Sequence, residues 1–197
     1  DKRTGAVQPY AAFEWAEPAA EVLDWEARQP RLLEELRSSG ADVICLQEVQ
    51  FESLGNDTFG LPAWLRSLEG YTAQLPGQSY LAQMAERNER VLGERVAIGC
   101  AVLYRADRLE PVGDEVSSPN TLVGLCVRGR QGTPLEALGP TAVFSVHLDA
   151  QSEQKRVEQL VRSLGVVRGF GSREAVIAGD MNTEILDGSC VGALLAR

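Results

Sequence analysis

Short apolar runs that end in polar residues are the feature that most constrains the fold of this chain. The segments "ADVICLQEV", "TAVFSVHLD" and "EAVIAGD" each hold such a run. A strand that is covered on both faces has this pattern, because neither face needs polar residues. The segments "VAIGCAVLYR" and "TLVGLCVRG" are strand-like in the same way. The chain is therefore expected to contain a sheet with a buried core.

Amphipathic segments alternate with these predicted strands. Residues 22–39 carry leucines at helical spacing among charged residues, which predicts a helix that Gly40 closes. Pro30 inside that segment predicts a kink or a restart. The clearest predicted helix covers residues 152–165, with Ser152 as its cap and with an apolar face of Val157, Leu160, Val161 and Leu164.

Other segments are less regular. Residues 61–71 predict a short helix with Pro62 near its first turn, and residues 79–95 predict either a helix or a mobile charged segment. Residues 130–140 are expected to form a turn or hairpin connection, and residues 188–197 the start of a helix. The order helix, strand, helix, several strands, helix, strand indicates a mixed α/β layered domain.

The composition is that of an ordinary folded protein. The chain has 197 residues, 44% hydrophobic and 24% charged, so one domain over residues 1–197 is expected, with an irregular segment at residues 1–20. No apolar run approaches the roughly 18 residues that cross a bilayer, and residues 1–10 lack a signal-peptide pattern. We therefore expect no membrane partner. The unpaired cysteines described below indicate an intracellular protein, with the cytoplasm favoured.

The net charge of −9 limits how this chain could bind nucleic acid. It argues against a broad basic surface, because phosphate neutralisation needs clustered Lys and Arg. It permits an enzyme that acts on phosphates, because a divalent cation can bridge carboxylates and phosphate oxygens.

The cysteines and the one histidine do not form a zinc motif. Cys45, Cys100, Cys126 and Cys190 show no close pairing, and three of them lie within apolar runs, so reduced core residues are expected. His147 is the only histidine. Any metal is therefore expected to be a hard cation on oxygen ligands.

Polar residues follow three of the predicted strands. Gln47 and Glu48 follow "VICL", His147 follows "VFSV", and Asp180 and Asn182 follow "VIAG". Each of these residues also has a simpler interpretation. Glu48 would lie where a strand reaches water, and His147 would be an ordinary hydrogen-bonded residue. Asp180 or Asn182 would cap a helix or form an Asx turn. Because layered α/β folds collect ligand-binding groups at strand ends, we expect them to share one cleft. Together these residue types suffice for a metal-assisted phosphoester hydrolase.

Four tracts in succession carry a resemblance to a known family. "ICLQEV", "GCAVLYR", "FSVHLD" and "VIAGDMN" resemble, in this order, the signatures of the endonuclease/exonuclease/phosphatase superfamily. "WEARQPRLLEEL", "LPAWLRSLEGY" and "GCAVLYRADRLE" further resemble its deadenylase branch, which includes the carbon catabolite repressor deadenylases, nocturnin, Angel and 2′-phosphodiesterase. The resemblance implies a deoxyribonuclease I-like α/β fold, a layered β-sandwich flanked by helices.

The resemblance also implies roles for single residues. Glu48 would bind Mg²⁺, with Mn²⁺ as the alternative ion. Asp180 would orient or deprotonate the attacking water, and Asn182 would hold that water or a phosphate oxygen. His147 would hydrogen-bond the phosphate and stabilise charge in the transition state.

Three other polar residues near these tracts are given lesser roles. Gln47 is expected to support the site at most. Lys155 and Arg156 are expected to lie on a solvated helix face.

Parts of the family pattern are missing from this sequence. The family's Asn-bearing strand ahead of the helix with Trp25, and its Ser-Asp-His strand with a second histidine, have no counterpart here. We expect a domain incomplete at both ends, a fragment of a full hydrolase; the alternative is a shortened homologue that no longer catalyses.

Three functions remain open from the sequence. The first, which we favour on the resemblance, is a Mg²⁺-dependent phosphodiesterase, a 3′–5′ exoribonuclease that acts on the 3′ end of RNA. The second is a phosphomonoesterase that acts on a small phosphorylated metabolite. The third is a non-catalytic interaction module.

Overall fold

The computed structural model describes residues 24–113, 116–118, 122–169, 174–183 and 191–192. The chain divides into two compact units, Asp1–Ala41 and Asp42–Arg197. Glu48, His147, Asp180 and Asn182 all belong to the second unit. That residues 1–197 form a single domain stays a prediction.

In the first unit, helix α2 (Trp25–Ser38) confirms the helix predicted over residues 22–39. The Asp24 carboxylate accepts a hydrogen bond from the Ala27 N–H at 3.0 Å and so caps the start of the helix. Gly40 follows its end with a φ of 58°. The helix continues through Pro30, so the predicted restart is wrong. The proline removes one N–H from the helix without ending it.

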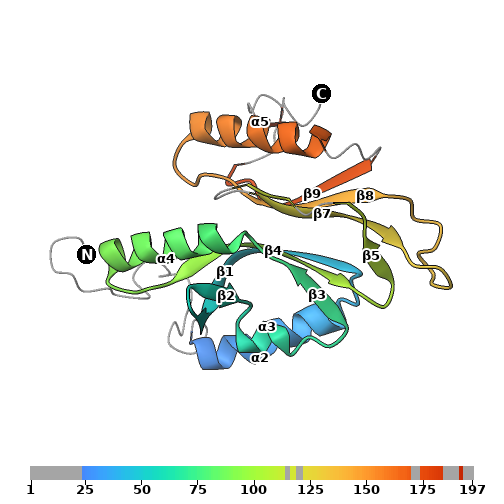
Figure 1. Ribbon diagram of the computed structural model, residues 1–197, viewed down its shortest axis with the longest axis horizontal. Coiled ribbons are helices and arrows are strands. Elements are labelled where there is room, and N and C mark those ends of the chain that lie inside the picture. Colours follow the sequence, from blue (N-terminus) through green and yellow to red (C-terminus); the bar gives the residue numbers. More distant parts are fainter. Residues whose placement is uncertain (1–23, 114–115, 119–121, 170–173, 184–190, 193–197) are drawn as a thin grey trace. The chain divides into compact units, whose positions relative to one another are not determined.

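The first sheet of the second unit is antiparallel, with the strand order β2-β1-β4-β3 (Figure 1). Its strands are β1 (Val43–Gly55), β2 (Thr58–Gly60), β3 (Tyr71–Gln74) and β4 (Ala97–Arg105). Asn56 and Asp57, both with positive φ, join β1 to β2 in a two-residue turn, as type I′ turns require. Helices α3 (Ala63–Arg66) and α4 (Gln78–Leu92) lie in the connections, and α4 packs against β2 and β4.

The second sheet has the order β5-β7-β8-β9, and β6 also pairs with β7. Its strands are β5 (Leu109–Pro111), β6 (Val116–Ser118), β7 (Leu122–Gly129), β8 (Thr141–His147) and β9 (Glu174–Asp180). The pairs are antiparallel except β8 with β9, which are parallel. Helix α5 (Glu153–Gly169) makes the crossover between these two parallel strands.

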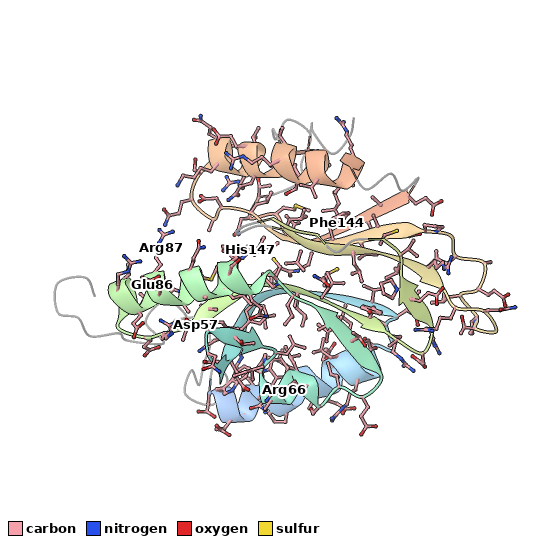
Figure 2. All side chains as sticks on the ribbon, in the orientation of Figure 1. Asp57, Arg66, Glu86, Arg87, Phe144 and His147 are labelled. Atoms are coloured by element: carbon pink, nitrogen blue, oxygen red, sulfur yellow. The ribbon has the colours of Figure 1, made fainter. Side chains whose placement is uncertain are left out.

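The core of the second unit has two layers, because side chains alternate along β7 and β8. The layer between the sheets contains Cys100, Val102, Tyr104, Leu109, Val123, Leu125, Val127 and Val143. The layer between the second sheet and α5 contains Leu122, Ala142, Phe144, Val146, Leu148, Leu160 and Val191. On β8 this alternation directs Phe144 toward α5 and leaves His147 on the face of Val143, toward the first sheet (Figure 2).

These layers confirm the predicted fold class, a mixed α/β architecture of two sheets and helices. The predicted strands around residues 97–105, 122–129, 141–147 and 174–180 are confirmed. Residues 79–95, left open between a helix and a mobile segment, are helical as far as Leu92. None of the described helices combines the length and the apolar character that spanning a bilayer requires.

Two details of the predictions are wrong. β1 does not end at Glu48 but continues to Gly55, because Val49 and Phe51 are buried and extend the strand. On the predicted apolar face of α5, Leu160 is buried as expected, but Val161 is 51% exposed, and the buried positions of the helix include Ser163. Of the helix start predicted at residues 188–197, only residues 191–192 lie within the described residues, and these are helical.

Candidate active site

Glu48 lies in a β-bulge in the middle of β1. The register between β1 and β4 shifts between Leu46 and Val49. Glu48 has a φ of 55°, a left-handed conformation that is uncommon for residues with a side chain. Regular alternation would put Glu48 and Gln47 on opposite faces of the sheet. The bulge instead brings Glu48 Oε1 to 3.9 Å from Nε2 of His147 on the second sheet.

His147 and Asp180 come together because β8 and β9 are parallel. They are the last residues of their strands and are direct partners in the ladder. Asp180 Oδ2 lies 4.0 Å from His147 Nε2. The imidazole therefore faces two carboxylates, and the side chains of Glu48 and Asp180 are 75% and 54% exposed. The structure thus brings together three of the four predicted site residues in an arrangement that solvent can reach.

Gly179 permits the close pairing of β8 and β9 at this point. It has a φ of 152° and is the partner of Val146. A Cβ atom on Gly179 would lie 1.9 Å from the Val146 carbonyl oxygen. The glycine of "AGDMN" therefore serves strand pairing within β9, and Asp180 is still part of the strand.

Asn182 ties the two strand ends together. Its side-chain amide donates a hydrogen bond to the Leu148 carbonyl oxygen at 2.8 Å, and the Leu148 N–H donates to the Asp180 carbonyl oxygen at 2.9 Å. The Asn182 N–H in turn donates to Asp180 Oδ1 at 2.8 Å, which is an Asx turn. Oδ1 of Asp180 is thus held by the backbone while Oδ2 faces His147. A contact of Asn182 with water or phosphate stays a prediction.

Ser145 makes a contact between the two sheets, next to the site, that the sequence did not predict. Its side chain is fully buried, yet its hydroxyl donates to the Leu46 carbonyl oxygen at 2.8 Å and accepts from Gln47 Nε2 at 2.9 Å. The signal was a polar residue in the apolar run "VFSV", two positions before His147. Ser145 joins the second sheet to the part of β1 that precedes Glu48.

The donor set fits a hard divalent cation. Glu48 and Asp180 offer exposed carboxylate oxygens, but no group of three His, Cys, Asp or Glu side chains that could hold a metal occurs among the described residues. A cation bound here would take one or two protein ligands and complete its shell with water, which is the coordination that Mg²⁺ prefers. Burial raises the pKa of Cys45 and of Cys100 to about 11, which disfavours the thiolates that a soft metal needs.

A separate hollow lies away from these residues. It has a volume of about 1220 Å³ and runs along α4 and Ile98, without Glu48, His147 or Asp180 in its lining. The site is defined by the side chains on the β1 bulge and at the ends of β8 and β9, and this hollow is not part of it.

The loop after β8 is fixed by Asp149 and Arg156. The N–H groups of Gln151 and Ser152 donate to the Asp149 carboxylate and lower its pKa. Arg156 donates to the Asp149 carbonyl oxygen and to Glu153, and its side chain is only 13% exposed. The prediction of a solvated face is therefore wrong for Arg156, because its long side chain reaches back over the loop. It holds for Lys155, whose side chain is 65% exposed.

The fold and the site together define a class of protein. Two sheets carry carboxylates and an imidazole to one point, from a bulge in β1 and from the ends of β8 and β9. The model of the Endonuclease/Exonuclease/phosphatase family matches residues 16–190. This chain belongs to that family. The match confirms the resemblance seen in "ICLQEV", "FSVHLD" and "VIAGDMN".

Individual relatives agree with the deadenylase-like branch. The CCR4-Not complex 3′-5′-exoribonuclease subunit Ccr4 of Schizosaccharomyces pombe is 34% identical over 87 residues, 44% of this chain and 11% of that protein. The human Nocturnin catalytic domain, solved with a bound sulfate anion, has a TM-score of 0.61 at 19% identity and covers 89% of this chain. ANGEL2, a 2′,3′-cyclic phosphatase solved with adenosine-2′,3′-vanadate, has a TM-score of 0.60 at 22% identity and covers 88% of this chain.

This chain matches only part of the length of these relatives. The chain spans 63% of the Nocturnin domain and 48% of the ANGEL2 chain. The two structures show a shared fold.

Proposed function

We propose that this chain carries the site of a divalent-metal-dependent phosphodiesterase, a 3′–5′ exoribonuclease of the deadenylase type that uses water to attack phosphorus. The observation that carries the proposal is the position of Glu48 Oε1 and Asp180 Oδ2 at 3.9 and 4.0 Å from His147 Nε2. The printed activity of the Ccr4 relative, a 3′-5′-exoribonuclease, supports RNA as the substrate. The cytoplasm is the location that we propose with this function.

Each residue has a role that suits its position. Glu48 would hold Mg²⁺, or Mn²⁺ as the alternative, and the ion supplies positive charge to the phosphate oxygens when bound. His147 donates a hydrogen bond to a phosphate oxygen and stabilises the charge that develops there. Asp180 orients the attacking water and accepts its proton through Oδ2, because Oδ1 is held by the Asn182 N–H. Asn182 keeps Asp180 in place, and the amide N–H that does not bond to Leu148 would contact the water or the phosphate.

Charge makes the metal requirement strict. The chain carries a net charge of −9, and two carboxylates face the imidazole. A phosphodiester that approaches these carboxylates without a cation is repelled. Chelation of divalent ions is therefore expected to abolish hydrolysis.

The test is magnesium-dependent release of nucleotides from the 3′ end of an adenosine-rich RNA. Both this chain and a version extended at both ends are assayed. His147→Ala and Glu48→Gln are each expected to lower kcat by about 100-fold or more. Lys155→Ala, an exposed change on α5, is the control and should retain activity. Absence of hydrolysis in both the chain and the extended version would refute the proposal.

A second candidate is phosphomonoester hydrolysis of a small metabolite. The acidic charge of the chain favours a small substrate over a long polyanion. A Bacteroides thetaiotaomicron mannosyl-6-phosphatase shares the fold, with a TM-score of 0.54 at 18% identity over 85% of this chain. Comparing an RNA oligonucleotide with nucleotide and inositol phosphates separates the two candidates.

A non-catalytic interaction module is the third candidate. It predicts no Mg²⁺ binding in calorimetry and little effect of Glu48→Ala on binding of a partner. Heat of Mg²⁺ binding that disappears in Glu48→Ala would exclude it.

A further inference from the structure

We infer that Ser145 is a positioning residue for Glu48, acting through Gln47 and the Leu46 carbonyl group. The inference rests on the proposed role of Glu48 as the cation-binding carboxylate. It adds to that proposal a residue on the opposite sheet that determines where the carboxylate stands.

The first observation is the geometry of the link. The Ser145 hydroxyl donates to the Leu46 carbonyl oxygen at 2.8 Å and accepts from Gln47 Nε2 at 2.9 Å. Leu46 and Gln47 are the two residues that immediately precede Glu48. A single hydroxyl therefore contacts the backbone of one and the side chain of the other.

The second observation is the strained backbone that this link adjoins. Glu48 has a φ of 55° within the bulge, and such a conformation persists only when the surroundings hold it. Regular pairing with β4 is interrupted between Leu46 and Val49, so the usual ladder does not fix this segment. Ser145 belongs to the second sheet, and its hydrogen bonds to Leu46 and Gln47 supply that restraint.

The third observation is the burial of Ser145. The side chain is 0% exposed, and its neighbour two positions along the same face of β8 is His147. One strand thus places the imidazole and also fixes the segment that carries the facing carboxylate. This arrangement couples Glu48 Oε1 to His147 Nε2, which are 3.9 Å apart.

Ser163 shows that a buried serine in this chain need not have such a role. It is 1% exposed, and its hydroxyl has no hydrogen-bond partner among the described residues. Ser163→Ala removes the same atom from the same degree of burial without breaking a hydrogen bond. It is the matched control for Ser145→Ala.

The experiment measures Mg²⁺ affinity by calorimetry, well below the unfolding temperature, on the chain and its variants. Ser145→Ala is expected to weaken Mg²⁺ binding about tenfold, since loss of a group that orients a metal ligand costs roughly 10–100-fold in affinity. Ser145→Thr keeps the hydroxyl and should bind as the unchanged chain does. Gln47→Met, at a partly exposed position, should weaken binding in the same direction and supplies a second variant if Ser145→Ala does not fold.

Measuring the Mg²⁺ dependence of hydrolysis separately from kcat distinguishes a residue that positions Glu48 from one that only stabilises the fold. In Ser145→Ala the Mg²⁺ concentration for half-maximal hydrolysis should rise about tenfold, while kcat at saturating Mg²⁺ stays close to that of the unchanged chain. A purely structural serine would lower the amount of folded protein and leave the Mg²⁺ affinity of the rest unchanged. Ser163→Ala should alter neither quantity.

The outcomes separate this inference from the proposed function. If Glu48→Gln binds Mg²⁺ as tightly as the unchanged chain, the proposed metal role of Glu48 is wrong and the positioning role is overturned with it. If Glu48→Gln loses Mg²⁺ binding while Ser145→Ala and Gln47→Met retain it, only the positioning role is overturned. Weakened binding in all three variants, with Ser145→Thr and Ser163→Ala unaffected, supports it.

Discussion

Replacing Gly179 by alanine tests how closely β8 and β9 pair beside the candidate site. The added Cβ would lie 1.9 Å from the Val146 carbonyl oxygen, and this backbone atom cannot move away as a flexible side chain would. The strands must therefore separate locally or Gly179 must change its φ of 152°. Either response disturbs the ladder position next to the pair formed by His147 and Asp180.

Three contributions of differing sign set the size of this loss of stability. A backbone conformation that suits only glycine costs about 1–3 kcal/mol in an alanine, and each ladder hydrogen bond that opens costs about 1 kcal/mol. The lower entropy of the unfolded alanine variant offsets about 0.4–1 kcal/mol. With one or two ladder hydrogen bonds opened, Gly179→Ala is therefore expected to lower the free energy of unfolding by about 1–4 kcal/mol, against the roughly 5–15 kcal/mol typical of a domain.

Urea unfolding followed by circular dichroism gives the free energy and its dependence on urea concentration. The matched control is Gly165→Ala in α5, where an added Cβ meets no atom within 4 Å. Because alanine favours a helix over glycine by roughly 1 kcal/mol, the control should be slightly more stable than the unchanged chain. The reasoning would be refuted if Gly179→Ala were as stable as the unchanged chain or if both variants shifted in the same direction.

Three further predictions concern the strain at Glu48, the loop before α5 and a buried thiol. Glu48→Gly should exceed Glu48→Ala in free energy of unfolding by urea by about 1 kcal/mol, because only glycine is unstrained at positive φ; equal midpoints would contradict this. Arg156→Met should lower the free energy of unfolding by about 1–2 kcal/mol in the same assay, because the Glu153 carboxylate and the Asp149 carbonyl oxygen lose a charged donor. Lys155→Met should change the free energy of unfolding by less than about 0.5 kcal/mol. Equal losses of stability in the Arg156 and Lys155 variants would show that Arg156 is not structural. For Cys100, a pKa raised by burial from 9.0 to about 11 predicts slow alkylation of the folded chain at pH 8. Because the folded pKa lies above the unfolded one, the associated stability is complete below pH 9 and is lost as the pH rises through 11. Rapid alkylation of folded Cys100, located by mass spectrometry, would contradict its burial.

The positions of His147 and Asp180 could be predicted because they depend on local rules. Each follows a short apolar run, and a crossover helix between the runs makes the strands parallel, with both carboxyl ends at one edge. The helix α5 between them was clear from its spacing and from Ser152, whose hydroxyl accepts the Lys155 N–H at 3.3 Å. These elements follow from periodicity and capping alone.

Glu48 could be picked out by its position after "VICL", but not by the conformation that makes it useful. The sequence pattern suggested a strand end, whereas the strand continues and a bulge changes the direction of the carboxylate. A bulge is set by the register between β1 and β4, which are about fifty residues apart along the chain. No local pattern encodes that register.

Ser145 and Arg156 were missed for a related reason. The partners of Ser145 are nearly a hundred residues away, on the other sheet, so its role depends on how the sheets pack. The burial of Arg156 depends on the path of the loop that carries Asp149. In both cases a side chain of ordinary surface type is used in a contact that only the folded chain creates.

The division of the site between two sheets has a consequence for its geometry. Glu48 is carried by one sheet and His147 with Asp180 by the other, and each sheet keeps its own backbone hydrogen bonds. A small slide of one layer against the other would part the carboxylate from the imidazole without unfolding either layer. The alignment of the two layers therefore sets whether the carboxylate and the imidazole meet.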